Sequence, residues 1–323
     1  MKFLETKFED YVISCCKENL HPELQPYFSS ISTHVISSHN THMIVYGPQG
    51  VGKYSQVLHY IQQFSPSKLK YERKLNINLS KKKQYFFKIS DIHFEIDMEL
   101  LGCNAKSLWN TTYHQILDIL STRTCRKGII VCKNFHKIHT ELLETFYSYM
   151  QTLTHRNIHL SYILITTGIS FIPDNILIRC LIIPVKRPTK AQYTKCIGRQ
   201  LVSNILTSKI RNIKDLYSKN STLMNINNVT VSRLIKHIKN YKELDFLLLR
   251  DHLYNIFIYH LDLNECIWEI LIYFIDEGSI DADKMERVLF FLSRFLKYYN
   301  NNYRPIYHLE RFILFLCKEI HEL

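Results

Sequence analysis

Glycine and proline are scarce in this sequence, with eight of each among its 323 residues. This scarcity excludes collagen-like, linker-like and turn-rich β architectures and predicts a chain dominated by helices. The N-terminal residues 1–20 are charged throughout and have no apolar core of a secretory signal. The most apolar stretch, residues 162–185, is interrupted by Pro173, Asp174 and Arg179, whereas a membrane span needs about 20 unbroken apolar residues. We therefore expect a soluble, intracellular protein without a membrane partner.

Cysteine pairs with metal-binding spacing are also absent. None of the nine cysteines forms the CxxC spacing of a structural zinc site or a thioredoxin-like centre. An odd cysteine count without a signal peptide predicts free thiols in a reducing compartment. The nearest approach to a metal cluster is Cys132 with His136 and His139, with Cys125 upstream. One strand cysteine and two surface histidines explain this group better than zinc, because structural sites show two paired ligand spacings. No metal site is predicted.

The composition is that of a globular chain with a strong basic surplus. Hydrophobic residues make up 46% and charged residues 22%, and the length predicts two or three domains. The 41 lysines and arginines against 29 acidic residues give a net charge of +12. Two interpretations of this surplus carry equal weight: a face that follows a nucleic-acid backbone, or a lysine-rich solvated surface. Candidates for such a face are Lys81–Lys83, Arg123, Arg126 and Lys127.

Short apolar runs alternate with helical patterns up to residue 183, which is typical of an α/β domain with a parallel sheet. The expected strands are residues 43–46, 85–89, 93–96, 129–132, 161–166 and 181–184. The expected helices between them are residues 53–63, 108–120 and 140–152. Pro188 then ends the strand pattern, and Thr189 is a plausible N-cap for the next helix.

Beyond Pro188 the pattern is entirely helical. Helices are expected over residues 191–206, 230–238, 244–274, 285–298 and 306–320. The Asn-rich stretches 218–228 and 298–303 are expected to be loops. The sequence thus predicts an all-α C-terminal region after the α/β domain.

A glycine-rich segment with a lysine lies directly between an expected strand and an expected helix. Such a loop lets backbone N–H groups surround phosphate oxygens, while the lysine adds a point charge and the helix N-terminus its dipole. The predicted nucleotide-binding residues are Gly47, Pro48, Gln49, Gly50, Val51, Gly52, Lys53, Tyr54 and Ser55.

Two departures from the usual pattern concern the metal and the hydrolysis step. Tyr54 stands where Ser or Thr normally holds Mg²⁺, and Ser55 comes one place late. After the apolar run 129–132 come Lys133 and Asn134, where acidic residues normally hold Mg²⁺ and polarise water. The sequence offers no carboxylate there. We therefore expect nucleotide binding without the usual Mg²⁺ anchor and with little or no hydrolysis.

Several segments in sequence order resemble the small subunits of replication factor C, the AAA+ sliding-clamp loader. Residues 47–56 resemble the family's phosphate loop, specifically that of the variant subunit whose hydroxyl residue is displaced one place, as Ser55 is. Residues 92–102 resemble the segment before the second helix of these subunits. Residues 133–151 align with the family's acidic box and the helix that follows it.

The resemblance continues toward the C-terminus. Residues 162–180 resemble the segment from sensor 1 to the Ser-Arg-Cys motif, in which Arg179 matches the arginine finger that acts in trans on a neighbour's nucleotide. Residues 306–310 resemble the collar helix of the same variant subunit. The eroded motifs, with an Asn-, Ile- and Lys-heavy composition, also resemble replication proteins of large DNA viruses.

The resemblance implies an AAA+ fold in three domains: a nucleotide-binding domain over residues 1–185, a helical lid over 186–243 and a helical collar for oligomerisation over 244–323. It implies ATP or ADP as the ligand. The implied partners are other clamp-loader-like AAA+ subunits, a sliding clamp and primer–template DNA. The implied location is the nucleus or a viral replication site in the cytoplasm.

Other departures from the family predict which activities are lost. Gly168 stands where the sensor-1 Asn would be, and Ile178 replaces the Ser of the Ser-Arg-Cys triplet. No sensor-2 arginine motif is found around residues 235–246. The residues that would act on this chain's own nucleotide are therefore largely replaced, while Arg179 is retained. We expect a non-hydrolysing subunit of an ATP-dependent complex rather than an ATPase by itself.

Two alternative functions stay open. The chain could be an AAA+-derived scaffold or structural component without an enzymatic role, which its retained partners would reveal. An origin-recognition-type initiator is weaker, because no C-terminal helix-turn-helix pattern is visible.

Ile116, Ile119 and Leu120 share a helical face that would meet a clamp in the family, but core packing explains at least two of them. Glu141 and Glu144 are expected on an exposed helix start rather than at the site.

Overall fold

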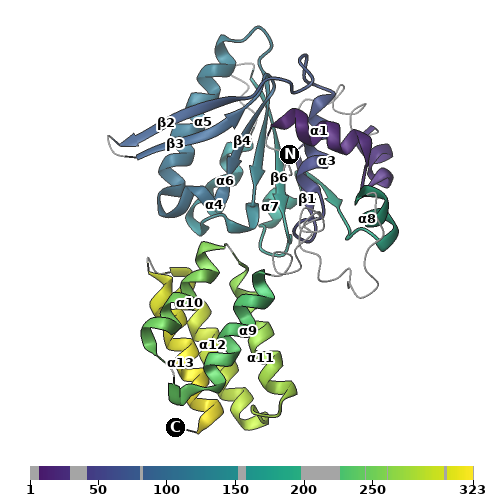
Figure 1. Ribbon diagram of the computed structural model, residues 1–323. Helices are drawn as coiled ribbons and strands as arrows, with labels where there is room; N and C mark the ends of the chain where they lie inside the picture. The colour runs from purple at the N-terminus through teal and green to yellow at the C-terminus, as the bar shows by residue number, and fades with distance from the viewer. Residues whose placement is uncertain are drawn as a thin grey trace. The chain divides into compact units, whose positions relative to one another are not determined.

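The computed structural model describes residues 7–29, 42–80, 83–151, 158–197, 226–243, 245–259, 261–301 and 304–322. The chain divides into two compact units, Met1–Tyr217 and Ser218–Leu323. Figure 1 shows a sheet with helices in the first and helices alone in the second. Across the described ranges, no helix combines the length and apolarity needed to cross a membrane.

The first unit is built on a seven-stranded sheet in the order β2-β3-β4-β5-β6-β1-β7. Five neighbouring strands, β4 to β7 and β1, run parallel, and β2 and β3 form an antiparallel hairpin at one edge. The strands are β1 (His42–Tyr46), β2 (Arg73–Ser80), β3 (Lys83–Ile89), β4 (His93–Asp97), β5 (Lys127–Lys133), β6 (His159–Thr166) and β7 (Cys180–Pro184).

Helices cover both faces of this sheet, as a parallel sheet requires. The helices are α1 (Phe8–Lys17), α3 (Lys53–Gln62), α4 (Met98–Leu101), α5 (Ala105–Thr122), α6 (Thr140–Tyr149), α7 (Asp174–Leu177) and α8 (Lys190–Ile197). One hydrophobic core joins the sheet to α5 and α6, and a second joins its other face to α1 and α3 (Figure 1). The predicted α/β class is confirmed: a largely parallel sheet with helices on both faces, followed by an all-α region.

The predicted strands are all present, but the prediction omitted β2. Its sequence alternates apolar Leu75 and Ile77 with Asn76 and Asn78, the period of a strand with one buried face. Ile77 is fully buried, and β2 pairs with β3 from Arg73 opposite Ile89 onward. The alternation was therefore a usable signal.

The start of α8 confirms the predicted cap at Thr189. The Thr189 Oγ1 accepts from the Gln192 backbone N–H, and the Gln192 side chain accepts from the Thr189 N–H at 2.7 Å. These reciprocal bonds form a capping box. The described part of α8 ends at Ile197, so the rest of the helix predicted over 191–206 lies outside the described residues.

Within its described residues, the second unit has five α-helices around one apolar core. They are α9 (Ile226–Lys239), α10 (Phe246–Ile258), α11 (Leu263–Asp276), α12 (Ala282–Asn301) and α13 (Pro305–His321). The helix predicted over 244–274 is wrong in one respect, because α10 and α11 are separate. Asp262 begins α11 by accepting from the Asn264 and Glu265 N–H groups, which makes it an N-cap.

Two predicted loops are shorter than expected. α9 already begins at Ile226, inside the predicted loop 218–228, and α12 continues to Asn301, inside the predicted loop 298–303. In both places the asparagines were taken as breakers, yet burial of neighbours such as Val231 and Phe295 holds the segment helical. The finer three-domain division stays a prediction.

Candidate functional site

The glycine-rich loop connects β1 to α3 at the carboxyl edge of the parallel strands, where ligands bind in α/β sheets. Gly47 has φ +154°, and a Cβ on it would lie 2.0 Å from the Val185 carbonyl oxygen. The Gly47 N–H donates to the Thr166 carbonyl at 3.3 Å. The loop is thus held between the ends of β6 and β7, and only glycine fits its first position.

The rest of the loop turns into α3 through two further glycines with positive φ. Gly50 has φ +68° and Gly52 +92°, a left-handed conformation that favours glycine. Gly52 is the N-cap of α3 and supplies no capping side chain. The first N–H groups of α3 therefore face the loop as free donors, the arrangement that binds phosphate.

Lys53 places its ammonium group inside the loop. Its Nζ donates to the Gly47 and Pro48 carbonyls at 2.5 Å each, and the residue is only 8% exposed. Burial lowers the pKa of Lys53 to about 8. The buried ammonium is paired with carbonyl dipoles rather than with a carboxylate, so an anionic phosphate would be a stronger partner for it.

Tyr54 and Lys133 lie together where the resemblance implies a magnesium site. The Lys133 Nζ is 4.6 Å from the centroid of the Tyr54 ring, a cation–π contact. Tyr54 also meets Tyr11 edge-on, with ring centroids 4.9 Å apart, and burial raises the pKa of its phenol well above the ordinary range. This place therefore carries a positive charge and a neutral ring instead of a hydroxyl and a carboxylate. Ser55 follows in the first turn of α3, half-buried.

Two carboxylates near this place were missed by the sequence analysis, which expected none. Asp97, at the end of β4, pairs in register with Lys133 at the end of β5. Asn134, with φ +50°, donates from Nδ2 to both Asp97 carboxylate oxygens at 3.0 and 3.2 Å. Glu95 is buried on the same strand and contributes to the raised pKa of Tyr54. The sequence could have indicated this contact, because parallel strands that are neighbours in a sheet have their carboxyl ends at the same edge.

An N-terminal segment covers the loop and α3, and the sequence analysis did not include it in the site. The His21 ring, 1% exposed, donates from Nε2 to the Val51 carbonyl at 2.7 Å. The Gln56 side chain on α3 donates to Asn19 Oδ1 at 2.6 Å. This segment fixes the position of α3 relative to the loop.

Arg179 lies at the amino ends of the parallel strands, whereas the loop lies at their carboxyl ends. It stands between α7 and β7, and the register pairs the next residue, Cys180, with His42 at the start of β1. The Arg179 guanidinium is 5.1 Å from the centroid of the Tyr147 ring. Burial lowers the pKa of His42 to about 4, with the Arg179 charge as a smaller cause. The structure therefore does not bring Arg179 together with residues 47–55.

The remaining candidate residues from the sequence analysis are explained by core packing or by surface exposure. Cys132 is fully buried in the core with α5 and α6, and burial raises its pKa well above the ordinary value. Ile116 and Leu120 are buried in that core as well, which confirms core packing for both. Glu141 and Glu144 are exposed on α6. In the stretches that are described, no group of three His, Cys, Asp or Glu residues could hold a metal ion.

The candidate basic face is only partly described. Arg123 donates to the Asp91 carbonyl at 2.6 Å and lies over the Phe94 ring, so it holds the fold together. Arg126 and Lys127 are exposed where β5 begins. Lys81 and Lys82 lie outside the described residues.

Comparisons with known proteins give only distant structural likenesses. No protein-family model and no curated protein matches the sequence. A DNA polymerase III gamma subunit-related protein of Thermotoga maritima is 10% identical, with 91% of this chain and 99% of that chain covered and a TM-score of 0.43. Cdc6p from Pyrobaculum aerophilum is 11% identical, with 92% and 94% covered and a TM-score of 0.39.

The RuvB Holliday junction branch migration motor of Thermotoga maritima is 12% identical, with 80% of this chain and 74% of that chain covered and a TM-score of 0.38. All three likenesses are distant. None of them assigns an activity to this chain.

Proposed function

We propose that this chain is a nucleotide-binding, non-hydrolysing subunit of an AAA+ assembly of the sliding-clamp-loader type. In this role it supplies Arg179 to a nucleotide held by a neighbouring subunit. The observation that carries the proposal is the separation of Arg179 from the chain's own phosphate loop.

The strand register gives the size of that separation. Cys180 pairs with His42 and Pro184 pairs with Tyr46, so β7 and β1 run side by side along their whole length. Four residue steps of ~3.3 Å place the two ends about 13 Å apart. Arg179 precedes one end and the loop follows the other, so a phosphate in contact with Arg179 would belong to another chain.

The surroundings of Arg179 support an interface at this edge. Ile178 is 85% exposed, and Leu181 and Ile182 are more than 40% exposed on the edge strand β7. Exposed apolar side chains on a sheet edge are typical of contact surfaces. An arginine among them would reach a neighbour's γ-phosphate and stabilise the charge that develops there.

The loop itself supports binding rather than turnover. Lys53 and the N–H groups of α3 suit phosphate, whether of ATP or ADP. Lys133 provides a positive charge where Mg²⁺ would otherwise be held, and the Asp97 carboxylate is engaged by Asn134. Neither the metal nor the attacking water then has its usual anchor.

The wider assignment follows from this role. The partners would be sister AAA+ subunits, a sliding clamp and primer–template DNA, in a reducing intracellular compartment, as in a viral or nuclear replication site. Residues 1–185 would form the nucleotide-binding domain, 186–243 the lid and 244–323 the collar.

The test uses the tagged chain recovered from its native source at moderate salt, with mass spectrometry of the bound proteins and an ATPase assay of the complex. We expect other AAA+ subunits or a clamp, and Arg179→Ala should remove the turnover of the one site that it contacts. Arg73→Ala, which removes an exposed arginine on β2, is the matched control. Recovery of structural proteins alone would favour the scaffold alternative, and an unchanged ATPase rate in Arg179→Ala would contradict the role in trans.

A further inference from the structure

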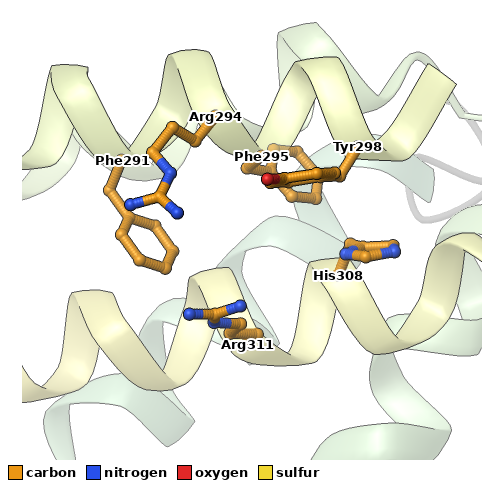
Figure 2. A pocket seen from close by; sticks show the side chains of 6 residues that line it. All are labelled: Phe291, Arg294, Phe295, Tyr298, His308 and Arg311. Carbon is orange, nitrogen blue, oxygen red and sulfur yellow. The ribbon is translucent and has the colours of Figure 1, made fainter. Parts of the chain in front are cut away.

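The second unit has a hollow between α12 and α13 that no role has yet been given. Its lining consists of Phe291, Arg294, Phe295, Tyr298, His308 and Arg311 (Figure 2). The hollow is small and open to solvent, so a ligand would lie across it rather than be enclosed by it.

The two antiparallel helices face each other in matched pairs on either side of the hollow. Lys284 on α12 donates to Glu322 at 2.8 Å, and Arg287 donates to Glu319 on α13 at 2.8 Å. One turn further, Phe291 stacks on Phe315 with centroids 4.0 Å apart. Each of these pairs joins opposite charges or parallel rings, as expected of helices that stabilise one another.

The next position breaks this complementarity. Arg294 on α12 and Arg311 on α13 both enter the hollow from opposite helices, as Figure 2 shows. Within the described ranges neither forms an ion pair, and the Arg311 guanidinium lies 5.6 Å from the centroid of the Phe291 ring. Two like charges on facing helices repel each other. An anion between them would convert this repulsion into attraction.

Aromatic rings form the other side of the hollow. Tyr298 stacks on His308 with centroids 5.7 Å apart and an interplanar angle of 16°. Tyr298 is 43% exposed, while Phe295, also part of the lining, is 3% exposed. An exposed ring that lines the same hollow as two guanidinium groups matches a nucleotide, which joins a planar base to a phosphate.

We propose that this hollow binds single-stranded nucleic acid, with a backbone phosphate between Arg294 and Arg311 and a base stacked at Tyr298. Guanidinium groups bind phosphate through paired N–H donors, and aromatic platforms with positive charge are the common means of holding single strands. A duplex keeps its bases stacked inside and offers only the phosphate. The site is separate from the phosphate loop and does not depend on the proposed nucleotide binding.

The test is fluorescence anisotropy of the full chain with a fluorescein-labelled oligothymidylate. Arg294→Gln and Arg311→Gln should each weaken binding about tenfold and reduce the slope of log affinity against log salt by about 0.7. Tyr298→Leu should weaken binding about tenfold through lost stacking. Arg287→Gln removes the same charge from the same helix and is the matched control, with affinity close to wild type.

Thermal unfolding separates binding from folding. Arg294→Gln breaks no ion pair and should not lower the melting temperature, whereas Arg287→Gln breaks the ion pair with Glu319 and should lower it slightly. Lys53→Ala should leave oligothymidylate binding unchanged.

Four results would overturn the proposal. They are an equal loss of affinity in Arg287→Gln, duplex DNA bound as tightly as the single strand, equal competition by polyglutamate, and abolished binding in Lys53→Ala.

Discussion

Raising the pH should release nucleotide from the phosphate loop, because Lys53 is the group that carries charge there. Burial lowers its pKa from 10.5 to about 8, and its neighbours are the Gly47 and Pro48 carbonyls rather than an acid. A bound phosphate favours the charged ammonium, so binding above pH 8 requires uptake of a proton. The phosphates of the nucleotide are already ionised, with a pKa of about 6 for a terminal group.

The magnitude follows from the two protonation states. At pH 7 about nine tenths of Lys53 is charged, and at pH 9 about one tenth, so the nucleotide Kd should rise about tenfold between these values. Folding stability should change in the opposite direction. Between pH 8 and 10.5 the unfolded chain binds more protons than the folded one, so the free energy of unfolding rises with pH.

The assay is titration of the chain with a fluorescent ATP analogue at constant ionic strength, from pH 7 to pH 10. Lys53→Arg is the control, because arginine stays charged throughout, and its Kd should be flat over the same range. A wild-type Kd that is also flat to pH 10 would refute the assignment of Lys53 as the phosphate-binding charge.

Three further predictions concern the loop and the opposite edge of the sheet. Nucleotide affinity should be the same in EDTA and in excess Mg²⁺, since Lys133 and Tyr54 lie together where the resemblance implies the metal. Lys133→Ala should weaken nucleotide binding, and a strong Mg²⁺ requirement would show that a metal anchor exists. Gly47→Ala should abolish nucleotide binding and lower the melting temperature, because its Cβ meets the Val185 carbonyl backbone at 2.0 Å; wild-type affinity in this variant would contradict the close approach. Acid should destabilise the first unit through His42, whose Nδ1 accepts from the Tyr162 N–H and whose pKa is about 4 against 6.5 in the unfolded chain. Stability should fall by about 3 kcal/mol as pH drops through this window, and denaturant titrations of His42→Asn, which keeps an acceptor, should show a smaller loss than wild type, with the exposed His114→Asn as control.

Local patterns predicted most of the fold. The segment from β1 through Gly47 to α3 was predictable because strand, loop and helix are adjacent in sequence and the motif is local. The break at Asp262 was missed because the apolar periodicity of α10 and α11 outweighed a single capping residue. β2 was missed although its alternation was present, because its polar positions are asparagines, which also favour turns.

The site was less predictable, because its geometry depends on pairing between distant segments. Asp97 and Asn134 meet only because β4 and β5 are neighbours in the sheet. His21 reaches Val51 only because α1 packs on α3. No sequence motif signals either contact, since each side chain is ordinary within its own segment.

β7 links the two ends of the first unit mechanically. Its last hydrogen bond, from the Val185 N–H to the Tyr46 carbonyl at 2.8 Å, adjoins the close approach of Gly47 to the Val185 carbonyl. Its first residue, Cys180, directly follows Arg179. This five-residue strand is paired along its length with β1 and so connects the loop directly to the base of Arg179. In the proposed role, a displacement of the loop at Gly47 would act along this strand on the base of Arg179, so the state of this chain's own loop would bear on the position of that arginine.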